Sequence, residues 1–142
     1  MKIMFVCSGN TGRSPMAQFV MRKLIADAGL ADKISVSSAA STQVDGGILH
    51  QGIFAKLRME KIPADTHVAH TLTPADYADS DLIVCMDAKA VAQTKELIGG
   101  DPDGKISTLL DRDIPWDKNA FATTYDDIVQ GCKALLKKIA DQ

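Results

Sequence analysis

Several features are scarce in this chain of 142 residues, and each scarcity argues against a class of protein. No apolar run reaches the roughly 18 residues that a membrane-spanning helix needs. Basic residues form no block, and the formal net charge is only −2, so the charge pattern does not favour nucleic-acid binding. Cysteine occurs three times, at spacings that suit neither a disulfide framework nor a metal site. We therefore expect no membrane, nucleic-acid or metal partner.

Targeting signals are also scarce. Met1-Lys2 leads into a brief apolar run that ends at Cys7, which is not the pattern of a signal peptide. A free cysteine at a reactive position suits a reducing compartment, so we expect a cytoplasmic protein. The length fits one domain, residues 1–142, large enough to bury roughly two thirds of its unfolded surface.

The chemistry of the chain is concentrated between the apolar run 3–6 and Pro15. Cys7 and Arg13 enclose five residues, two of them glycine, and Ser14-Pro15 predicts a helix N-cap followed by proline at the first helical position. A short loop between a strand and a helix N-terminus can direct several backbone N–H groups at an anion, and the helix dipole favours negative charge there. The pattern predicts a phosphate-binding loop with a nucleophilic thiol and a bidentate arginine. The competing interpretation is an ordinary buried cysteine at the end of a core strand.

Hydrophobic periodicity predicts strands alternating with helices. Strands are expected over residues 2–6, 34–38, 81–86 and 105–108, and helices over about 15–28, 49–61, 88–97 and 122–140, with residues 62–74 irregular. This alternation implies an α/β fold, a doubly wound four-stranded parallel sheet in the order 2-1-3-4 with helices on both faces. Ligands bind such sheets at the carboxyl ends of the strands where the winding direction switches, which places the phosphate loop after strand 1.

The loop resembles that of the low-molecular-weight protein tyrosine phosphatases, Cys-x-Gly-Asn-x-x-Arg-Ser-Pro after an N-terminal strand. The likeness continues to Cys132, and the loop matches at Cys7, Gly9, Asn10, Arg13, Ser14 and Pro15. The resemblance implies a cofactor-independent hydrolase of phosphotyrosine proteins or small aryl phosphates that also binds phosphate, sulfate or vanadate. Cys7 would attack phosphorus and Arg13 would bind its oxygens.

Further residues receive roles from the same resemblance. The substrate-binding set would be Ser8, Gly9, Asn10, Thr11, Gly12, Ser14 and Trp116, with Trp116 forming an aromatic wall of the cleft. Ser38 and His67 would support the loop through hydrogen bonds. Gly12 departs from many eukaryotic members, which carry a second cysteine there.

The general acid is the point at which the resemblance is weakest. The family takes its acid from an Asp-Pro pair, whereas residues 111–117 here read Asp-Arg-Asp-Ile-Pro-Trp-Asp, with no aspartate directly before the proline. Asp113 and Asp117 flank Pro115, and Asp113 is the preferred acid because the proline holds this segment extended. Both could instead be solvated loop carboxylates.

Two other functions remain open from the sequence. An arsenate reductase on the same scaffold would need further cysteines to resolve its adduct, and Cys85 and Cys132 lie in a predicted core strand and helix. A phosphate-binding pseudophosphatase would follow if the altered acid loop had ended turnover.

Overall fold

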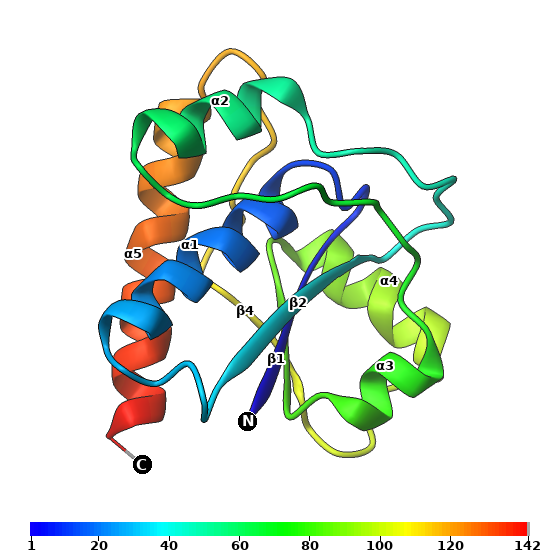
Figure 1. Ribbon diagram of the computed structural model, residues 1–142. Coiled ribbons are helices and arrows are strands. Elements are labelled where there is room, and N and C mark those ends of the chain that lie inside the picture. The colour runs from blue at the N-terminus through cyan, green and yellow to red at the C-terminus, as the bar shows by residue number, and fades with distance from the viewer. Residues whose placement is uncertain (142) are drawn as a thin grey trace.

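The structure, a computed structural model that describes residues 1–141, is a four-stranded parallel sheet flanked by helices (Figure 1). The strands are β1 (Lys2–Cys7), β2 (Ser35–Ala40), β3 (Leu82–Cys85) and β4 (Ile106–Thr108), in the order β2-β1-β3-β4. The predicted fold class and strand order are therefore confirmed. The helices are α1 (Arg13–Asp27), α2 (Gln51–Met59), α3 (Pro74–Asp79), α4 (Ala88–Ile98) and α5 (Phe121–Ala140).

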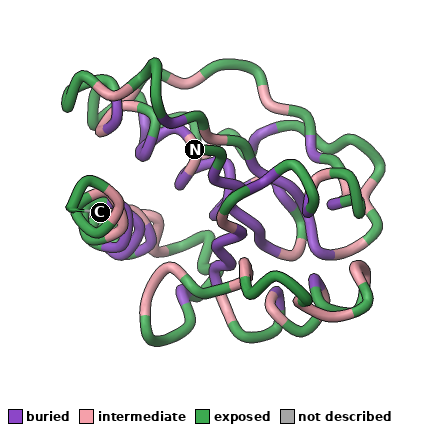
Figure 2. The backbone as a smooth tube through the Cα atoms, turned by 90° about the horizontal axis from the view of Figure 1, so that it is seen from below, coloured by how far each residue is buried: buried purple, intermediate pink, exposed green. Residues whose placement is uncertain are grey.

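Strand β1 forms the centre of the core because both faces of the sheet are covered there. Ile3, Phe5 and Cys7 pack into the cluster that includes α1 and α5, whereas Met4 and Val6 belong to a second cluster with α3 and α4. This alternation follows from the two-residue period of a strand. Burial on both faces explains why the strand reads as an unbroken apolar run. Figure 2 shows the buried stretches gathered in the sheet and on the inner side of the helices.

The order of the strands fixes where a site can form. The chain leaves β1 through α1 to reach β2 on one side, and it later returns as β3 on the other side of β1. The winding direction therefore switches at the carboxyl end of β1, where a crevice opens in folds of this type. Cys7 is the last residue of β1.

Helix α3 is the one element that the sequence pattern does not predict. Its N-terminus carries a reciprocal cap in which the Thr73 hydroxyl accepts from Asp76 N–H and the Asp76 carboxylate accepts from Thr73 N–H, with Pro74 next in the chain. Thr-Pro-x-Asp is a recognisable start signal, but the helix is too short to show a periodic apolar stripe. Before it, the irregular segment 62–74 contributes two isolated bridges, Ala40 with Thr71 and Ile48 with Val68.

Several predicted boundaries shift for identifiable reasons. Strand β2 covers 35–40 instead of 34–38, because Ala39 and Ala40 pair with Val6 and Cys7 in the buried part of the sheet. Helix α2 covers 51–59 instead of about 49–61, because the ring Nδ1 of His50 accepts a hydrogen bond from Gly52 N–H and so caps the helix. The N-cap of α4 lies at Asp87, as predicted.

Candidate active site

The loop of residues 7–13 encloses a cavity of about 180 Å3 at the carboxyl end of β1. One end of the loop is held by the strand and the other by the first turn of α1, so its position is set by two rigid elements. A single residue from a distant part of the chain completes the wall. The lining residues are Cys7, Ser8, Gly9, Asn10, Thr11, Gly12, Arg13 and Trp116.

Asn10 organises the interior of this loop. It is fully buried and has a positive φ of 56°, a left-handed conformation that asparagine tolerates better than most residues. Its side-chain amide donates to Ser14 Oγ at 2.9 Å and to Ser38 Oγ at 3.0 Å. Its Oδ1 lies 3.0 Å from His67 Nε2, which also lies 3.0 Å from the Asn10 carbonyl oxygen. The two residues predicted to support the loop, Ser38 and His67, therefore both contact Asn10.

The directions of these hydrogen bonds lead to the sulfur of Cys7. Ser14 Oγ accepts from Asn10, so its own proton is free to point at Cys7 Sγ, 2.9 Å away. The backbone N–H of Asn10 approaches the same sulfur at 3.3 Å. Ser38 in turn donates to Gln18 Oε1 at 2.6 Å, which leaves the Ser38 oxygen to accept from Asn10. Two donors thus converge on Sγ, as a thiolate nucleophile requires.

His67 is held neutral at this position. Both groups that face its Nε2 are oxygen acceptors, so Nε2 carries the proton. Burial lowers the pKa of His67 below 6.5, the hydrogen bond to the Asn10 backbone raises it in part, and the nearby side chains of His70 and Arg22 lower it further. A neutral ring with the proton on Nε2 donates a hydrogen bond to the two oxygen atoms of Asn10.

Arg13 is anchored through one nitrogen. Its Nη1 donates to Asp87 Oδ2 at 2.6 Å and to the carbonyl oxygen of Ile114 at 2.7 Å, and only 7% of the residue is exposed. Among the described residues, every hydrogen bond from this guanidinium to the protein uses Nη1, so the edge with Nε and Nη2 remains for a ligand. A planar guanidinium fixed in this way presents a preorganised fork to two oxygens of one phosphate.

Asp87 is a site residue whose role the sequence interpretation missed. The sequence identifies it only as the N-cap of α4, and its Oδ1 does accept from Ala90 N–H. Its second oxygen holds Arg13. The signal was available, because Asp87 follows β3, the strand adjacent to β1, and the carboxyl ends of parallel neighbours lie together.

The start of α1 corrects one prediction. The N-cap is Gly12, not Ser14, and no side chain caps the helix. Ser14 lies inside the helix, and its hydroxyl is engaged by Cys7 and Asn10. Because no side chain caps the N-terminus of α1, its first N–H groups are free to bind an anion at this end of the helix.

Trp116 closes the cavity by lying directly on Gly12. A Cβ atom added to Gly12 would lie 2.7 Å from Trp116 Cη2, so any side chain at this position would displace the indole from where it lies. The indole also packs against His50 and Phe121, with ring centroids 5.5 Å and 5.3 Å away. The predicted aromatic wall is therefore present, and two further aromatic neighbours that the sequence did not indicate support it.

The candidate acids do not line the cavity. Asp113 Oδ1 accepts a hydrogen bond from Ala88 N–H at 2.9 Å, at the start of α4, and Asp117 Oδ1 accepts from Asn119 N–H at 2.9 Å. Asp113 is nevertheless close to the site along the chain, because its neighbour Ile114 is bound both to Arg13 and to Met86. The extended segment expected before Pro115 thus positions the backbone of Ile114, while the Asp113 carboxylate rests on α4.

The other two cysteines are buried and separate from Cys7 chemistry. Burial raises the pKa of Cys85 to about 12 and also raises the pKa of Cys132. Neither lines the cavity. Among residues 1–141, no resolving thiol is therefore positioned for an arsenate reductase, and that alternative is not supported.

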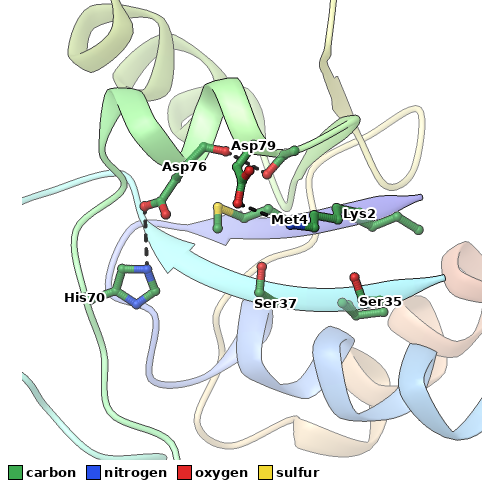
Figure 3. A pocket seen from close by; sticks show the side chains of 10 residues that line it. Lys2, Met4, Ser35, Ser37, His70, Asp76 and Asp79 are labelled. Atoms are coloured by element: carbon green, nitrogen blue, oxygen red, sulfur yellow. Dashed lines mark hydrogen bonds and ion pairs between the residues drawn. The ribbon is translucent and has the colours of Figure 1, made fainter. Parts of the chain in front are cut away.

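A second hollow, of about 310 Å3, lies along β1 and β2 on the side where α3 packs (Figure 3). It is lined by Lys2, Ser35, Ser37, His70 and Asp76, with His70 Nε2 3.7 Å from Asp76 Oδ2. Its lining residues include neither a cysteine nor an arginine, so it lacks the pairing of thiol and guanidinium found in the first cavity.

Two features are missing from the part of the chain that the structure describes. Within residues 1–141, no cluster of three histidine, cysteine or acidic side chains is arranged to hold a metal ion. No helix in the same range combines the length and apolarity needed to cross a bilayer.

Comparison with known proteins agrees with this geometry. The family described as low molecular weight phosphotyrosine protein phosphatase matches residues 2–142. The low molecular weight protein-tyrosine-phosphatase YfkJ of Bacillus subtilis is 32% identical, over 96% of this chain and 94% of its own. Its crystal structure superposes with a TM-score of 0.92 and covers 99% of this chain and 95% of that one.

Two further relatives extend the comparison. The low molecular weight phosphotyrosine protein phosphatase of Homo sapiens is 31% identical over 96% of this chain and 94% of its own. A structure of the YwlE arginine phosphatase, a C7S mutant with a phosphorylated active-site serine, is 25% identical with a TM-score of 0.89, covering 99% of this chain and 96% of that one.

Proposed function

The chain belongs to the low molecular weight protein tyrosine phosphatase family, and from this we propose that it hydrolyses phosphotyrosine and aryl phosphate monoesters through a phosphocysteine intermediate formed on Cys7. One observation carries the proposal. Two hydrogen-bond donors converge on Cys7 Sγ in a cavity that also presents an anchored Arg13. Nucleophile and anion clamp thus share a single cavity.

The reaction has two displacements at phosphorus. In the first, the Cys7 thiolate attacks, an S–P bond forms, and the bond to the phenolic oxygen breaks while a carboxylic acid protonates that oxygen. In the second, water attacks phosphorus and gives a proton to the carboxylate left by the first step, the S–P bond breaks, and inorganic phosphate and the thiolate are released. Arg13 and the loop N–H groups bind the equatorial oxygens, where charge is spread in both transition states.

Asp113 is the proposed acid, with Asp117 as the alternative. Both belong to the loop that carries Trp116, and Asp113 is one residue from the Ile114 carbonyl that holds Arg13. A rotation of the exposed Asp113 side chain away from Ala88 N–H would release it from its resting position. If neither aspartate acts, the site binds phosphate without efficient turnover, which is the pseudophosphatase alternative.

The test compares wild type with Cys7→Ser and Arg13→Lys on p-nitrophenyl phosphate and a phosphotyrosine peptide, without added metal. Cys7→Ser should abolish turnover and keep phosphate or vanadate binding, because the hydroxyl is nearly isosteric but far less acidic. Arg13→Lys should lower kcat severely, since a lysine cannot form the bidentate fork. Residual Cys7→Ser activity within tenfold of wild type would rule out the cysteine mechanism. Phosphate binding with no turnover by wild type would favour the pseudophosphatase.

The acid is tested separately. Asp113→Asn should lower kcat by about 100-fold on phosphotyrosine and much less on p-nitrophenyl phosphate, whose leaving group needs less protonation. Asp117→Asn should be mild on both. The reverse pattern would move the acid role to Asp117.

Phosphoarginine is a second candidate substrate. One structural neighbour is an arginine phosphatase. The cavity wall here carries the polar side chain of Thr11, whose methyl group faces Gly47 and whose hydroxyl faces Gly9. A hydroxyl on the wall can accept from a guanidinium N–H, whereas Trp116 favours an aromatic ring. A kcat/KM for a phosphoarginine peptide that exceeds the value for its phosphotyrosine counterpart would establish this substrate in place of the first.

The expected cellular setting follows from the nucleophile. All three cysteines are unpaired. A mechanism that depends on a reduced Cys7 works in a reducing compartment, so we place the activity in the cytoplasm.

A further inference from the structure

Two large apolar side chains are exposed side by side on a short pair of extended segments. Residues 47–49 and 67–69 run antiparallel, with Leu49 N–H donating to the His67 carbonyl at 3.1 Å and Ala69 N–H to the Gly47 carbonyl at 2.7 Å. Ile48 and Val68 are therefore directly opposite each other and project to the same side. Their exposed fractions are 65% and 57%, while Leu49 and Ala69, which point the other way, are buried. Ile48 and Val68 are here called the apolar pair.

The apolar pair adjoins the catalytic cavity. A Cβ on Gly47 would lie 3.2 Å from Thr11 Cγ2, and one on Gly46 would lie 3.5 Å from Val68 Cγ1. On the other side of Ile48, the backbone N–H of His50 donates to the Thr11 carbonyl at 2.8 Å. The segment that carries Ile48 is thus hydrogen-bonded to Thr11 through His50 and lies close to Thr11 at Gly47, and Thr11 lines the cavity.

A broad hollow adjoins Ile48 of the apolar pair and shares no lining residue with the cavity. Its volume is about 750 Å3, and its lining combines the apolar residues Ile48, Leu49, Phe54, Ala55 and Ala64 with the polar residues Gln51, Asp65, Thr66 and His67. Phe54 is 39% exposed there. The exposed large apolar residues are few, and four of them (Ile48, Phe54, Val68 and Trp116) belong to the cavity, the apolar pair or this hollow.

We propose that the apolar pair and the adjoining hollow bind an apolar side chain of the phosphoprotein substrate, within a few positions of the phosphorylated residue. The proposal rests on the proposed function, because the cavity would fix the phosphorylated residue, and an extended chain that leaves it on the Thr11 side would pass over Ile48. Such a chain advances about 3.3 Å per residue, so a neighbouring side chain reaches the apolar pair within a few positions.

The charge around the apolar pair argues against an acidic substrate segment, and the small size of the surface argues against a second copy of the chain. Asp45 precedes Gly46, and Asp65 lines the hollow, so an acidic side chain beside the phosphorylated residue would meet like charge. A stable dimer commonly buries about 800 Å² on each partner through 20–30 residues, far more than two side chains and one hollow supply. A short apolar segment fits both features.

The experiment uses the full chain and peptides in which leucine, serine or glutamate is placed in turn at each of the four positions on either side of phosphotyrosine. Wild type should show a kcat/KM about tenfold higher with leucine than with serine at one or two positions, and glutamate should be poorest there. The double variant Ile48→Ser/Val68→Ser should lose this preference while its p-nitrophenyl phosphate hydrolysis stays unchanged. Met59→Ser removes another exposed apolar residue, at the far end of α2 and outside the hollow, and should keep the preference.

Binding measurements keep the proposal separate from turnover. Cys7→Ser should bind the leucine peptides about tenfold more tightly than the serine peptides. Cys7→Ser that also carries Ile48→Ser and Val68→Ser should bind both with equal affinity. Equal kcat/KM for leucine and serine peptides, with p-nitrophenyl phosphate hydrolysis intact, would overturn the docking proposal and leave the proposed function standing. If wild type is a dimer in solution and the Ile48→Ser/Val68→Ser variant is a monomer, the surface binds a second copy of the chain. That result would also overturn the docking proposal. Absence of all hydrolysis would refute the proposed function, and the Cys7→Ser affinities would still decide the docking proposal.

Discussion

Replacement of Asn10 by alanine should be the most destructive single change in the loop outside the nucleophile and the arginine. The side chain takes part in four hydrogen bonds: it donates to Ser14 and Ser38, and it accepts from His67 Nε2 and from His70 N–H. At about 1 kcal/mol for each neutral hydrogen bond, their loss costs about 3 to 5 kcal/mol. Alanine in a left-handed conformation costs about 1 kcal/mol more. The total is a large share of the roughly 5–15 kcal/mol that stabilises a typical domain.

Glycine at position 10 separates the two contributions. Asn10→Gly loses the same hydrogen bonds but accommodates the φ of 56° without strain, so it should be about 1 kcal/mol more stable than Asn10→Ala. Urea unfolding of wild type, both variants and the exposed control Asn119→Ala measures these differences. The kcat on p-nitrophenyl phosphate should fall in both Asn10 variants, because Ser14 loses the partner that orients its proton toward Cys7.

The result that would refute this reasoning is specific. If Asn10→Ala lies within about 1 kcal/mol of wild type, the network contributes little beyond what water would supply. If alanine and glycine are equally stable, the left-handed backbone carries no cost. The first outcome would mean that the loop is held mainly by β1 and α1 and not by its interior hydrogen bonds, and the second would remove only the backbone contribution.

The remaining predictions concern His67 and the cysteines. The folded-state pKa of His67 is lowered, so the unfolded chain takes up the proton first as the pH falls below 6.5, and stability should decrease from that pH down through the folded pKa. Thermal unfolding between pH 7.5 and pH 5 should show this decrease in wild type and a smaller one in His67→Gln, and equal slopes would contradict it. Iodoacetamide near neutral pH should modify Cys7 alone, with protection by phosphate, because burial raises the pKa of Cys85 and Cys132. Mass spectrometry that finds Cys85 or Cys132 labelled as fast as Cys7 would contradict the assignment.

The fold could be predicted from sequence because its signals are local and mutually consistent. The run 3–6 is buried on both faces and therefore uninterrupted, and Asp87 and Gly99 mark the two ends of α4, with Gly99 at a left-handed φ of 88°. Helix α3 was missed because six residues are too few for periodicity to show. The start of α1 was misplaced because Ser14 has two possible partners, the helix backbone or Cys7, and a sequence does not reveal which one it binds.

The residue pattern alone predicts the site where the loop itself supplies the chemistry, and Ser38, His67 and Trp116 come from the family resemblance. Residues 7–13 are contiguous, so their convergence follows from one turn of chain. The pairing of Arg13 with Asp87 joins residues 74 positions apart, and the stacking of Trp116 on Gly12 depends on how a distant loop returns. Strand order places Asp87 near the loop and the family resemblance names Trp116, but the contacts that these two residues make are set by the tertiary structure.

The position of Asp113 leads to a last prediction, about the hydrogen bond that holds its carboxylate away from the cavity. Ala88 is the first residue of α4, where proline is well tolerated, and Asp87 before it has the extended backbone that a following proline requires. Ala88→Pro therefore removes the N–H that binds Asp113 Oδ1 while leaving the helix intact. An exposed hydrogen bond to a carboxylate contributes about 1.5 kcal/mol, so its removal should make Asp113 about tenfold more available as an acid. If the acid step limits turnover, kcat on phosphotyrosine should rise toward tenfold in Ala88→Pro, remain unchanged on p-nitrophenyl phosphate, and lose the increase when Asp113→Asn is added. An equal increase in the presence of Asp113→Asn would show that the proline acts through Asp87 and Arg13, and Asp113 would then no longer be the proposed acid.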